Sequence, residues 1–220
     1  MTHNKLLSSL DTPNFSLSGD ASSVESGFKT PPADPLLLLK NWLEQAYTLH
    51  VPEPKAFTLV TVGKNYKPSS RIVIFKNLAE DGLVFGCSSA SPKSIQMSQV
   101  PNVSGTFWWQ KTIQQINFTG TVKKADAAIS DKIFYERDRS ARAISYLSRQ
   151  SQPLEDESTL RNSVQSLATS DTEINRPESW CAYRIHFDTI EFFIGSPDRF
   201  HKRLQYKLED KKWGHTMLQP

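Results

Sequence analysis

The chain has 220 residues, including 12 Phe and five Trp, which suits one domain with a sizeable core. Its formal net charge of +3 at pH 7 is too small to favour a nucleic-acid partner. The longest apolar run, Leu36–Leu39, is far shorter than the roughly 20 residues that cross a membrane. Cys87 and Cys181 show neither metal-site spacing nor a disulfide framework, so we expect a cytoplasmic protein without a membrane segment.

The first 33 residues differ from the rest of the chain. They are rich in serine, lack an apolar period and end at Pro31-Pro32, which is typical of a mobile arm. Asp34 followed by Pro35 is typical of a helix start, and apolar residues at helical spacing predict a helix over about 35–48. We therefore expect an arm over 1–33 and one domain over 34–220.

Beyond this helix, short β-type runs are separated by turn residues. They predict two consecutive hairpins from strands 57–62, 69–75 and 83–88. A helix over 91–100 and a strand pair over 102–109 and 113–123 follow. The remaining predicted helices cover 126–136, 139–149 and 155–169, and the remaining strands cover 180–187, 189–193, 203–208 and 213–218. Because strands follow one another directly, we expect an α+β protein with an antiparallel β-barrel and peripheral helices, not a doubly wound sheet.

Two segments carry cations that suit an anion. Arg71 and Lys76 bracket a β-run, in which alternation places Arg71 on the face of Val73 and Lys76 on the opposite face. Ser91-Pro92-Lys93-Ser94 opens a short helix, where backbone N–H groups and Lys93 can bind a phosphate. Alternatively, Arg71 and Lys76 are solvated charges at the ends of a strand, and Ser91-Pro92-Lys93-Ser94 is an ordinary helix cap.

Three further groups have both a functional and a structural interpretation. Gln114 and Gln115 put one amide on each face of a strand, and such an amide can bind a heterocycle edge or simply face water. Around one helix start stand three arginines, Arg137, Arg139 and Arg142. They can bind an anion, or they can simply form a solvated basic face. If 199–203 is a strand, its residues Arg199, His201 and Arg203 point the same way, and a histidine there can act as an acid, a base or a hydrogen-bond donor.

Motifs in a consistent order run from about Asp34 to Pro220. They are Asp34-Pro35-Leu36 with Trp42, Arg71-Ile72-Val73-Ile74-Phe75-Lys76, Ser91-x-Lys93, Phe107-x-Trp109, Gln115, Ser148-Arg149-Gln150-Ser151, Trp180, Ile190-Glu191-Phe192, Arg199-Phe200-His201-Lys202-Arg203 and Met217-Leu218-Gln219-Pro220. Together they resemble the pyridoxamine/pyridoxine 5′-phosphate oxidase family. The resemblance implies a Greek-key split β-barrel, FMN as cofactor and a homodimer, with no metal.

The resemblance also implies cofactor-binding residues, some of which reach across the dimer interface. They are Arg71, Ile72, Val73, Ile74, Phe75, Lys76, Lys93, Gln115, Gln150, Ser151, Phe193 and Arg203. Three positions depart from the family: Pro92 replaces a phosphate-binding Arg, Phe193 replaces a Trp, and Gly86-Cys87 replaces Tyr-Thr. Losing one charged hydrogen bond weakens FMN binding by about 1–3 kcal/mol and leaves the other contacts.

For the substrate, the resemblance implies that Arg199 and His201 are catalytic residues over the ring, while Lys76 and Arg137 hold its phosphate. Ile133 and Ala141 stand where the family has a Tyr and a Ser, so two hydroxyl donors are absent. The arm of the family also supplies an Arg, and this chain has none before Arg71.

Our first interpretation is an FMN-dependent oxidase of pyridoxamine or pyridoxine 5′-phosphate. The substrate would give a hydride to flavin N5, and molecular oxygen would then reoxidise the flavin. One alternative is a flavin oxidoreductase of the phenazine-biosynthesis type, acting on another flat anionic substrate. The more apolar pocket expected from Ile133 and Ala141 suits this alternative. Another is a non-catalytic module that binds FMN or pyridoxal phosphate.

Overall fold

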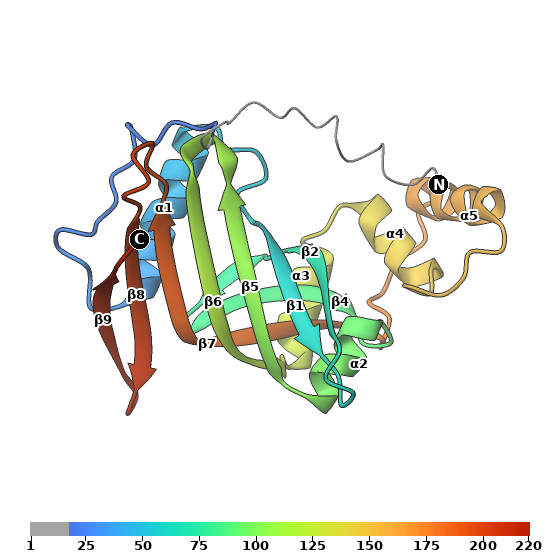
Figure 1. Ribbon diagram of the computed structural model, residues 1–220. Helices are drawn as coiled ribbons and strands as arrows, with labels where there is room; N and C mark the ends of the chain where they lie inside the picture. Colours follow the sequence, from blue (N-terminus) through green and yellow to red (C-terminus); the bar gives the residue numbers. More distant parts are fainter. Residues whose placement is uncertain (1–17) are drawn as a thin grey trace, which may run out of the picture.

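The computed structural model describes residues 18–220 as a curled antiparallel sheet with helices around it (Figure 1). Its strands are β1 (Ala56–Val62), β2 (Pro68–Ile74), β3 (Asn77–Ala79), β4 (Gly82–Ser88), β5 (Asn102–Trp109), β6 (Gln114–Lys124), β7 (Trp180–Ile194), β8 (Lys202–Glu209) and β9 (Lys212–Leu218). The strand order is β2-β1-β5-β6-β7-β4-β3, and β8 pairs with both β7 and β9. The predicted α+β class with an antiparallel split barrel is confirmed.

Strand β7 is continuous over 15 residues, whereas the sequence pattern predicts a break at Asp188. Its first half pairs with β4 and its second half with β8, while β6 pairs with it on the other side. The β6–β7 register shifts between Thr119 and Gly120. A Cβ at Gly120 would lie 2.0 Å from the His186 carbonyl oxygen, so only glycine allows the two strands this close an approach.

The predicted pairing of 69–75 with 83–88 is wrong. Strand β2 pairs with β1 alone, and β4 instead forms its hairpin with the three-residue strand β3. Strand β2 ends at Ile74, and the side chain of the next residue, Phe75, is buried among the aromatic side chains of the barrel core. Strands β2 and β4 are neighbours in the sequence, yet they stand towards opposite ends of the strand order.

The helices are α1 (Pro35–Thr48), α2 (Pro92–Gln99), α3 (Ala127–Tyr135), α4 (Arg139–Leu147) and α5 (Glu157–Thr169), close to their predicted bounds. Helix α1 packs on the sheet through Trp42, whose ring contacts Trp109 and Phe192. Helices α4 and α5 pack on each other and project to one side of the sheet (Figure 1). One core fills the barrel, and a second, smaller one lies between α3 and the other face of β4 and β7.

Residues 18–33 belong to the segment that the sequence assigns to a mobile arm. The Trp42 indole donates to the Ser26 carbonyl at 3.1 Å, and the Glu25 amide donates to the Gln45 side chain at 2.9 Å. Phe28 stacks on Trp42 with ring centroids 5.9 Å apart. These residues therefore pack against α1, and the rest of the predicted arm, residues 1–17, lies outside the described part of the chain.

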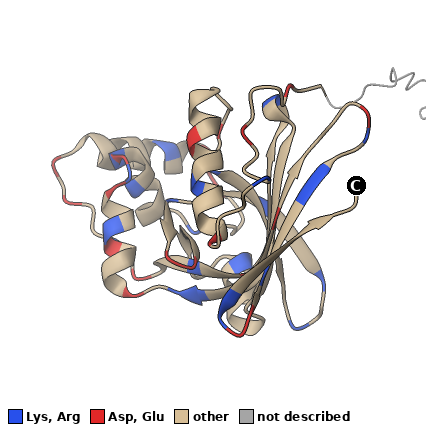
Figure 2. Ribbon diagram, turned by 90° about the vertical axis from the view of Figure 1, so that its left-hand side faces the viewer, with Lys and Arg blue, Asp and Glu red and all other residues tan. Residues whose placement is uncertain are grey.

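Charged residues of both signs are interspersed over most elements (Figure 2). Within residues 18–220, no group of three or more His, Cys, Asp or Glu side chains has the arrangement of a metal site. Within the same range, no helix is long and apolar enough to cross a membrane.

Replacing Asp34 by alanine should lower the free energy of unfolding by about 1 kcal/mol, because Asp34 is the N-cap of α1. Its carboxylate accepts a hydrogen bond from the Leu36 amide at 2.9 Å. Thermal unfolding followed by circular dichroism should show a Tm lower by roughly 2–4 °C. Glu44→Ala is the control, since Glu44 makes only an exposed pair with Lys40. Equal Tm losses in both variants would contradict the capping role.

Candidate functional site

A basic cluster lies where β2 passes the start of α2. Helix α2 is attached to the sheet through Gln96, whose Oε1 accepts from Thr61 Oγ1 and from Ser69 Oγ at 2.8 Å. The same two hydroxyl groups hold Arg71, whose guanidinium donates to Thr61 Oγ1 and to Ser69 Oγ, both at 2.7 Å. Gln96 therefore brings the first turn of α2, with Lys93, towards Arg71.

Lys93 is only 7 % exposed, although it stands in the first turn of a helix. Its ammonium donates to Ser91 Oγ at 3.2 Å, and Ser91 Oγ in turn donates to the Ser88 carbonyl. Ser94 Oγ donates to the same carbonyl at 2.7 Å. Hydroxyl groups and one ammonium thus surround the helix start that the sequence predicts as a phosphate site.

The electrostatics of this cluster favour an added anion. Burial lowers the pKa of the Lys93 ammonium, and the charge of Arg71 lowers it further. Burial also lowers the pKa of Arg71. None of the ion pairs found among residues 18–220 includes Lys93 or Arg71. Two partly desolvated cations without a carboxylate are a site that a phosphate would stabilise.

Gln150 and Arg137 extend this cluster along the end of β4. The Gln150 side-chain oxygen accepts from the Ser88 amide at 3.1 Å. Ser88 pairs with Trp180 at the start of β7, and the Arg137 guanidinium lies 5.3 Å from the Trp180 ring. Arg137 also donates to Ser145 Oγ. The structure therefore brings together Arg71, Lys93, Gln150 and Arg137, which we call the α2-side half-site. Ser151, beside Gln150, has a positive φ of 69°.

The apolar residues at positions 133 and 141 lie in two different surroundings. Ile133 is 1 % exposed and packs in the smaller core with Phe134 and Trp180. Ala141 lines a groove of about 700 Å³ between α4 and α5. Neither position offers a hydroxyl group, as the sequence comparison with the family anticipates.

The other two arginines of this region have local roles. Arg139 donates to the Leu167, Ala168, Ser170 and Thr172 carbonyls, so it fastens the end of α5. The Arg142 guanidinium lies 6.0 Å from the Tyr135 ring, and its Nε has no partner within residues 18–220. The interpretation as a solvated basic face therefore does not hold for Arg139, because its guanidinium donates hydrogen bonds to backbone carbonyl oxygens.

A second group of predicted residues gathers at the far end of β7. Gln115, Phe193 and Arg203 are direct register partners across β6, β7 and β8. The Arg203 guanidinium donates to both carboxylate oxygens of Glu191, at 2.7 and 3.1 Å. These hydrogen bonds raise the pKa of Arg203. As predicted, the two glutamines face opposite ways: Gln114 is buried and its amide lacks a partner within the described residues, while Gln115 is half-buried.

Arg199 and His201 lie in the loop before β8, so the conditional strand interpretation of 199–203 is wrong for them. Arg199 has a positive φ of 67°, and β8 begins only at Lys202. The His201 ring lies 5.1 Å from the Phe193 ring. Its Nδ1 accepts from the Ser196 amide at 3.0 Å, so a neutral His201 carries its proton on Nε2. We call this group, with Gln115, Phe193 and Arg203, the β8-side half-site.

The two half-sites are far apart within one chain. Trp180 and Phe193 stand near opposite ends of β7, so roughly 40 Å of strand, at about 3.3 Å per residue, joins them along a path that bends between its two halves (Figure 1). This is far more than the length of one small aromatic molecule. Arg137 and His201 of the same chain therefore cannot hold the same substrate.

The β2 stretch that the resemblance assigns to the cofactor has two different faces. Phe75 is buried and Val73 packs against the barrel core, so a ligand would reach only their backbones. Ile72 and Ile74 point outwards and are 72 % and 47 % exposed. Lys76 is exposed, and its amide donates to the Val84 carbonyl beside the smaller core.

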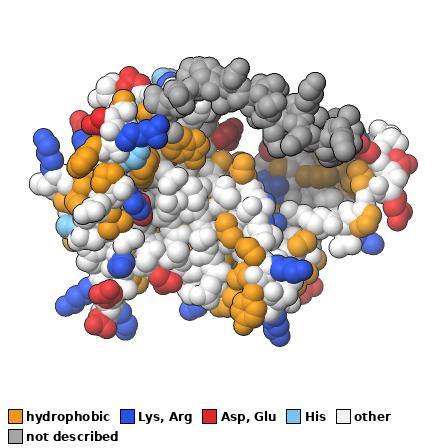
Figure 3. Space-filling view, in the orientation of Figure 1, with side chains coloured by type: hydrophobic (Ala, Val, Ile, Leu, Met, Phe, Trp, Pro, Cys, Tyr) orange, Lys and Arg blue, Asp and Glu red, His pale blue; other side chains and the backbone are white. Residues whose placement is uncertain are grey.

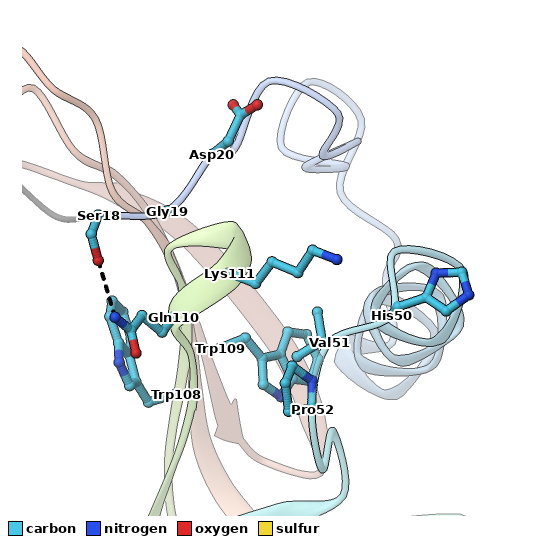
Figure 4. Close-up of a pocket in the computed structure, with 10 residues that line it drawn as sticks. All are labelled: Ser18, Gly19, Asp20, His50, Val51, Pro52, Trp108, Trp109, Gln110 and Lys111. Carbon is cyan, nitrogen blue, oxygen red and sulfur yellow. Dashed lines mark hydrogen bonds between the residues drawn. The ribbon is translucent and has the colours of Figure 1, made fainter.

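A cavity of about 770 Å³ opens at the end of β5 that is remote from α2 (Figure 4). It is lined by Ser18, Gly19, Asp20, His50, Val51, Pro52, Trp108, Trp109, Gln110 and Lys111. Figure 4 shows the Lys111 side chain extending between Asp20 and His50. None of the predicted site residues lines this cavity, so it is separate from both half-sites.

Two family models match the chain and together cover most of it. Residues 43–171 match the model described as pyridoxamine 5′-phosphate oxidase. Residues 180–220 match the model described as the pyridoxine 5′-phosphate oxidase C-terminal dimerisation region. The second match covers β7, β8 and β9 and includes every residue of the β8-side half-site except Gln115, which lies on β6.

Curated relatives and a solved structure agree with these models. A dihydrophenazinedicarboxylate synthase of Pseudomonas chlororaphis is 33% identical over 205 residues, covering 93% of this chain and 92% of the relative. A pyridoxine/pyridoxamine 5′-phosphate oxidase of Chromohalobacter salexigens is 34% identical over 206 residues, covering 92% of this chain and 94% of the relative. The crystal structure of PhzG from Burkholderia lata in complex with tetrahydrophenazine-1-carboxylic acid has a TM-score of 0.88 at 32% identity, covering 92% of this chain and 100% of that one.

Proposed function

The chain belongs to the pyridoxamine 5′-phosphate oxidase family, and we propose that it is an FMN-dependent oxidase of a partially reduced tricyclic aromatic carboxylate. Its relatives are enzymes of two kinds, and the chain is an oxidoreductase-like enzyme rather than a pure binding module. This choice of substrate is supported by the residue types at the two positions where the resemblance implies phosphate contacts, since Ile133 and Ala141 offer no hydroxyl group, and by the 33% identity to a dihydrophenazinedicarboxylate synthase.

The α2-side half-site suits the phosphate of FMN. Lys93 and Arg71 supply two partly buried cations without a neighbouring carboxylate, and the start of α2 supplies backbone N–H groups. Gln150 lies next to them. FMN, when bound, would accept two electrons from the substrate and pass them to molecular oxygen.

A homodimer would unite the two half-sites. Each site would take Arg137 from one chain and His201 from its partner, because one chain holds them too far apart. The match of residues 180–220 to a dimerisation region supports this arrangement. Hydrophobic side chains also gather at the surface where β2 and α2 lie (Figure 3), including Ile72, Ile74 and Ile95.

The absence of hydroxyl groups at positions 133 and 141 suits a flat carboxylate better than a phosphate ester. A phosphate dianion needs several donors, and the positions of Ile133 and Ala141 provide none. A guanidinium can bind one carboxylate through two parallel hydrogen bonds. The Arg137 guanidinium lies 5.3 Å from the Trp180 ring, which holds it beside the smaller core.

The β8-side half-site would orient the substrate over the flavin. Because Ser196 binds His201 Nδ1, the Nε2–H of a neutral His201 is free to donate to a ring nitrogen or a carboxylate. Arg199 adds a cation in the same loop. Phe193 lies under His201 and provides an apolar surface that excludes water.

A pyridoxamine or pyridoxine 5′-phosphate oxidase remains the second candidate. Its support is the pair of cations Lys76 and Arg137, which stand at the phosphate-contact positions that the resemblance implies. The relative from Chromohalobacter salexigens carries this activity in its name.

Kinetics with both substrate classes should separate the candidates. We expect kcat/KM for a dihydrophenazine carboxylate to exceed that for pyridoxamine 5′-phosphate by at least about 100-fold, which corresponds to roughly 2.7 kcal/mol of transition-state binding. Oxygen consumption and hydrogen peroxide release would be measured for each. The matched control is the same tricycle without its carboxylate, which should lose most of the advantage because Arg137 then has no partner. A higher kcat/KM for pyridoxamine 5′-phosphate would refute the proposed substrate class.

A further inference from the structure

The Arg203 guanidinium is held at three of its N–H groups. Its Nε donates to Glu191 Oε1 at 2.7 Å, and its Nη2 donates to Glu191 Oε2 at 3.1 Å. Its Nη1 donates to the Gln219 carbonyl at 3.2 Å. A guanidinium carries five N–H groups, so two of them have no partner within residues 18–220. The Arg203 side chain is 33 % exposed, so a ligand can reach it.

Glu191 lies on the same face of the sheet as the β8-side half-site. Phe193 follows it by two positions along β7, and side chains two positions apart share a face. Phe193 is also the register partner of Gln115 on β6 and of Arg203 on β8. Glu191 therefore stands beside the row formed by these three residues, outside the barrel core, and none of the sequence interpretations gave it a role in the site.

The contact between Glu191 and Arg203 differs from an ordinary surface ion pair. The Glu191 side chain is only 13 % exposed, so its carboxylate has lost most of its water and depends on Arg203 for compensation. Two parallel hydrogen bonds also fix the plane of the guanidinium. A free arginine side chain loses rotamer freedom when a ligand binds, whereas a side chain that is already fixed does not.

The same contact compensates the charge of Arg203. In the basic cluster at α2, neither Lys93 nor Arg71 belongs to any ion pair found among residues 18–220, which suits a phosphate. At β8, the carboxylate of Glu191 lies directly against the Arg203 cation. Opposite charges this close largely cancel at a distance, so Arg203 offers hydrogen bonds with little net attraction for an anion.

We propose that Glu191 is a positioning residue of the flavin site, which fixes the Arg203 guanidinium before FMN binds and compensates its charge. Arg203 then donates its remaining N–H groups to a neutral part of FMN, while the cations at α2 hold the phosphate. Glu191 acts only through Arg203 and needs no contact with the ligand. The inference rests on the proposed function, because FMN is the ligand in question.

A double-mutant cycle with Arg203 tests this role. Glu191→Gln keeps the length of the side chain and removes its charge, and it should raise the FMN dissociation constant about 10-fold, because Arg203 loses its charged bonds and its fixed plane. In an Arg203→Met background, Glu191→Gln should not weaken FMN binding further, because no guanidinium is left to position. A similar rise in both backgrounds, or no rise in the wild-type background, would overturn the proposal.

The charge compensation has its own measurement. Glu191→Gln leaves the Arg203 cation without its carboxylate, so added salt should weaken FMN binding more in this variant than in the wild type. Equal salt dependence would overturn the compensation.

Glu157→Gln is the matched control for the substitution. Arg161 Nε donates to Glu157 Oε1 at the same distance of 2.7 Å, but this pair lies on α5, outside both half-sites. Its loss should change the FMN dissociation constant by less than about twofold. Thermal unfolding of the flavin-free proteins would verify that all variants are folded. A rise equal to that of Glu191→Gln would overturn the specific role of Glu191.

The positioning can also be measured without FMN. Heteronuclear NMR of the flavin-free protein should show the Arg203 Nε–H signal, which is assigned by its absence from Arg203→Met. Its proton should exchange with water about 10-fold faster in Glu191→Gln, because a neutral acceptor forms a weaker hydrogen bond than a carboxylate. Equal exchange rates would overturn the positioning role. If the wild type shows the slow exchange and binds no FMN, the proposed function fails and the contact between Glu191 and Arg203 stands.

Discussion

Replacing Lys93 by methionine should weaken FMN binding by about 10- to 100-fold, because a charged hydrogen bond is worth about 1.5–3 kcal/mol. Lys93 is buried beside Arg71, and Pro92 offers no second side-chain cation in this turn. Methionine keeps the unbranched apolar stem, so packing of the α2 start is largely retained. The dissociation constant would be measured by quenching of flavin fluorescence.

Lys76→Met is the control for this experiment. Lys76 is exposed and stands outside the basic cluster of Arg71 and Lys93, so its loss should change the FMN dissociation constant by less than about fivefold. Thermal unfolding of the flavin-free proteins would verify that both variants are folded. Equal dissociation constants in the two variants would show that the phosphate of FMN does not bind at α2.

Mixing two inactive variants should restore about one quarter of the wild-type activity, if each site uses both chains. Arg137→Ala and His201→Ala should each lose more than about 95% of kcat/KM, which corresponds to about 2 kcal/mol. A dimer with one chain of each kind contains one site that lacks both side chains and one site that retains both. About half of the dimers are mixed after random exchange, and each mixed dimer has one intact site.

The control is a mixture of two variants from the same half-site, Arg199→Ala and His201→Ala. Every site in their mixed dimers lacks one of the two side chains, so activity should stay near the level of the separate variants. Chain exchange would be confirmed by native mass spectrometry of differently tagged chains. No recovery in the Arg137→Ala and His201→Ala mixture, despite confirmed exchange, would show that one chain supplies both residues.

The local elements of the fold could be predicted because short-range chemistry decides them. Asp34-Pro35 starts α1 as expected, since an N-cap and a proline at the first position act within one turn. Alternation along β2 correctly placed Arg71 and Val73 on one face, and the structure shows that this is the less exposed face. The missed features are long-range: β7 continues past Asp188, the residue skipped at the register shift, because β6 pairs with it on both sides of that residue, from Tyr183 to Ile194.

The residue types of the candidate site were also visible in the sequence, but their contacts were not. Glu191, Ser196 and Trp180 complete the surroundings of Arg203, His201 and Arg137. Only Trp180 and Glu191 stood within recognised motifs, and neither motif indicated which cation they meet. Ser196 carries no sequence signal at all, because its contact uses the backbone amide.

The sequence by itself therefore determined the helices, most of the strands, the family and the cations that suit an anionic ligand, because these depend on residue type and on near neighbours in the chain. Only the tertiary structure decided that Cys87 lies opposite Cys181, since strand register arises from packing of the whole sheet. It likewise decided that Arg137 and His201 stand at opposite ends of β7. A 15-residue strand keeps its ends apart whatever side chains they carry, so a site that needs both residues needs two chains.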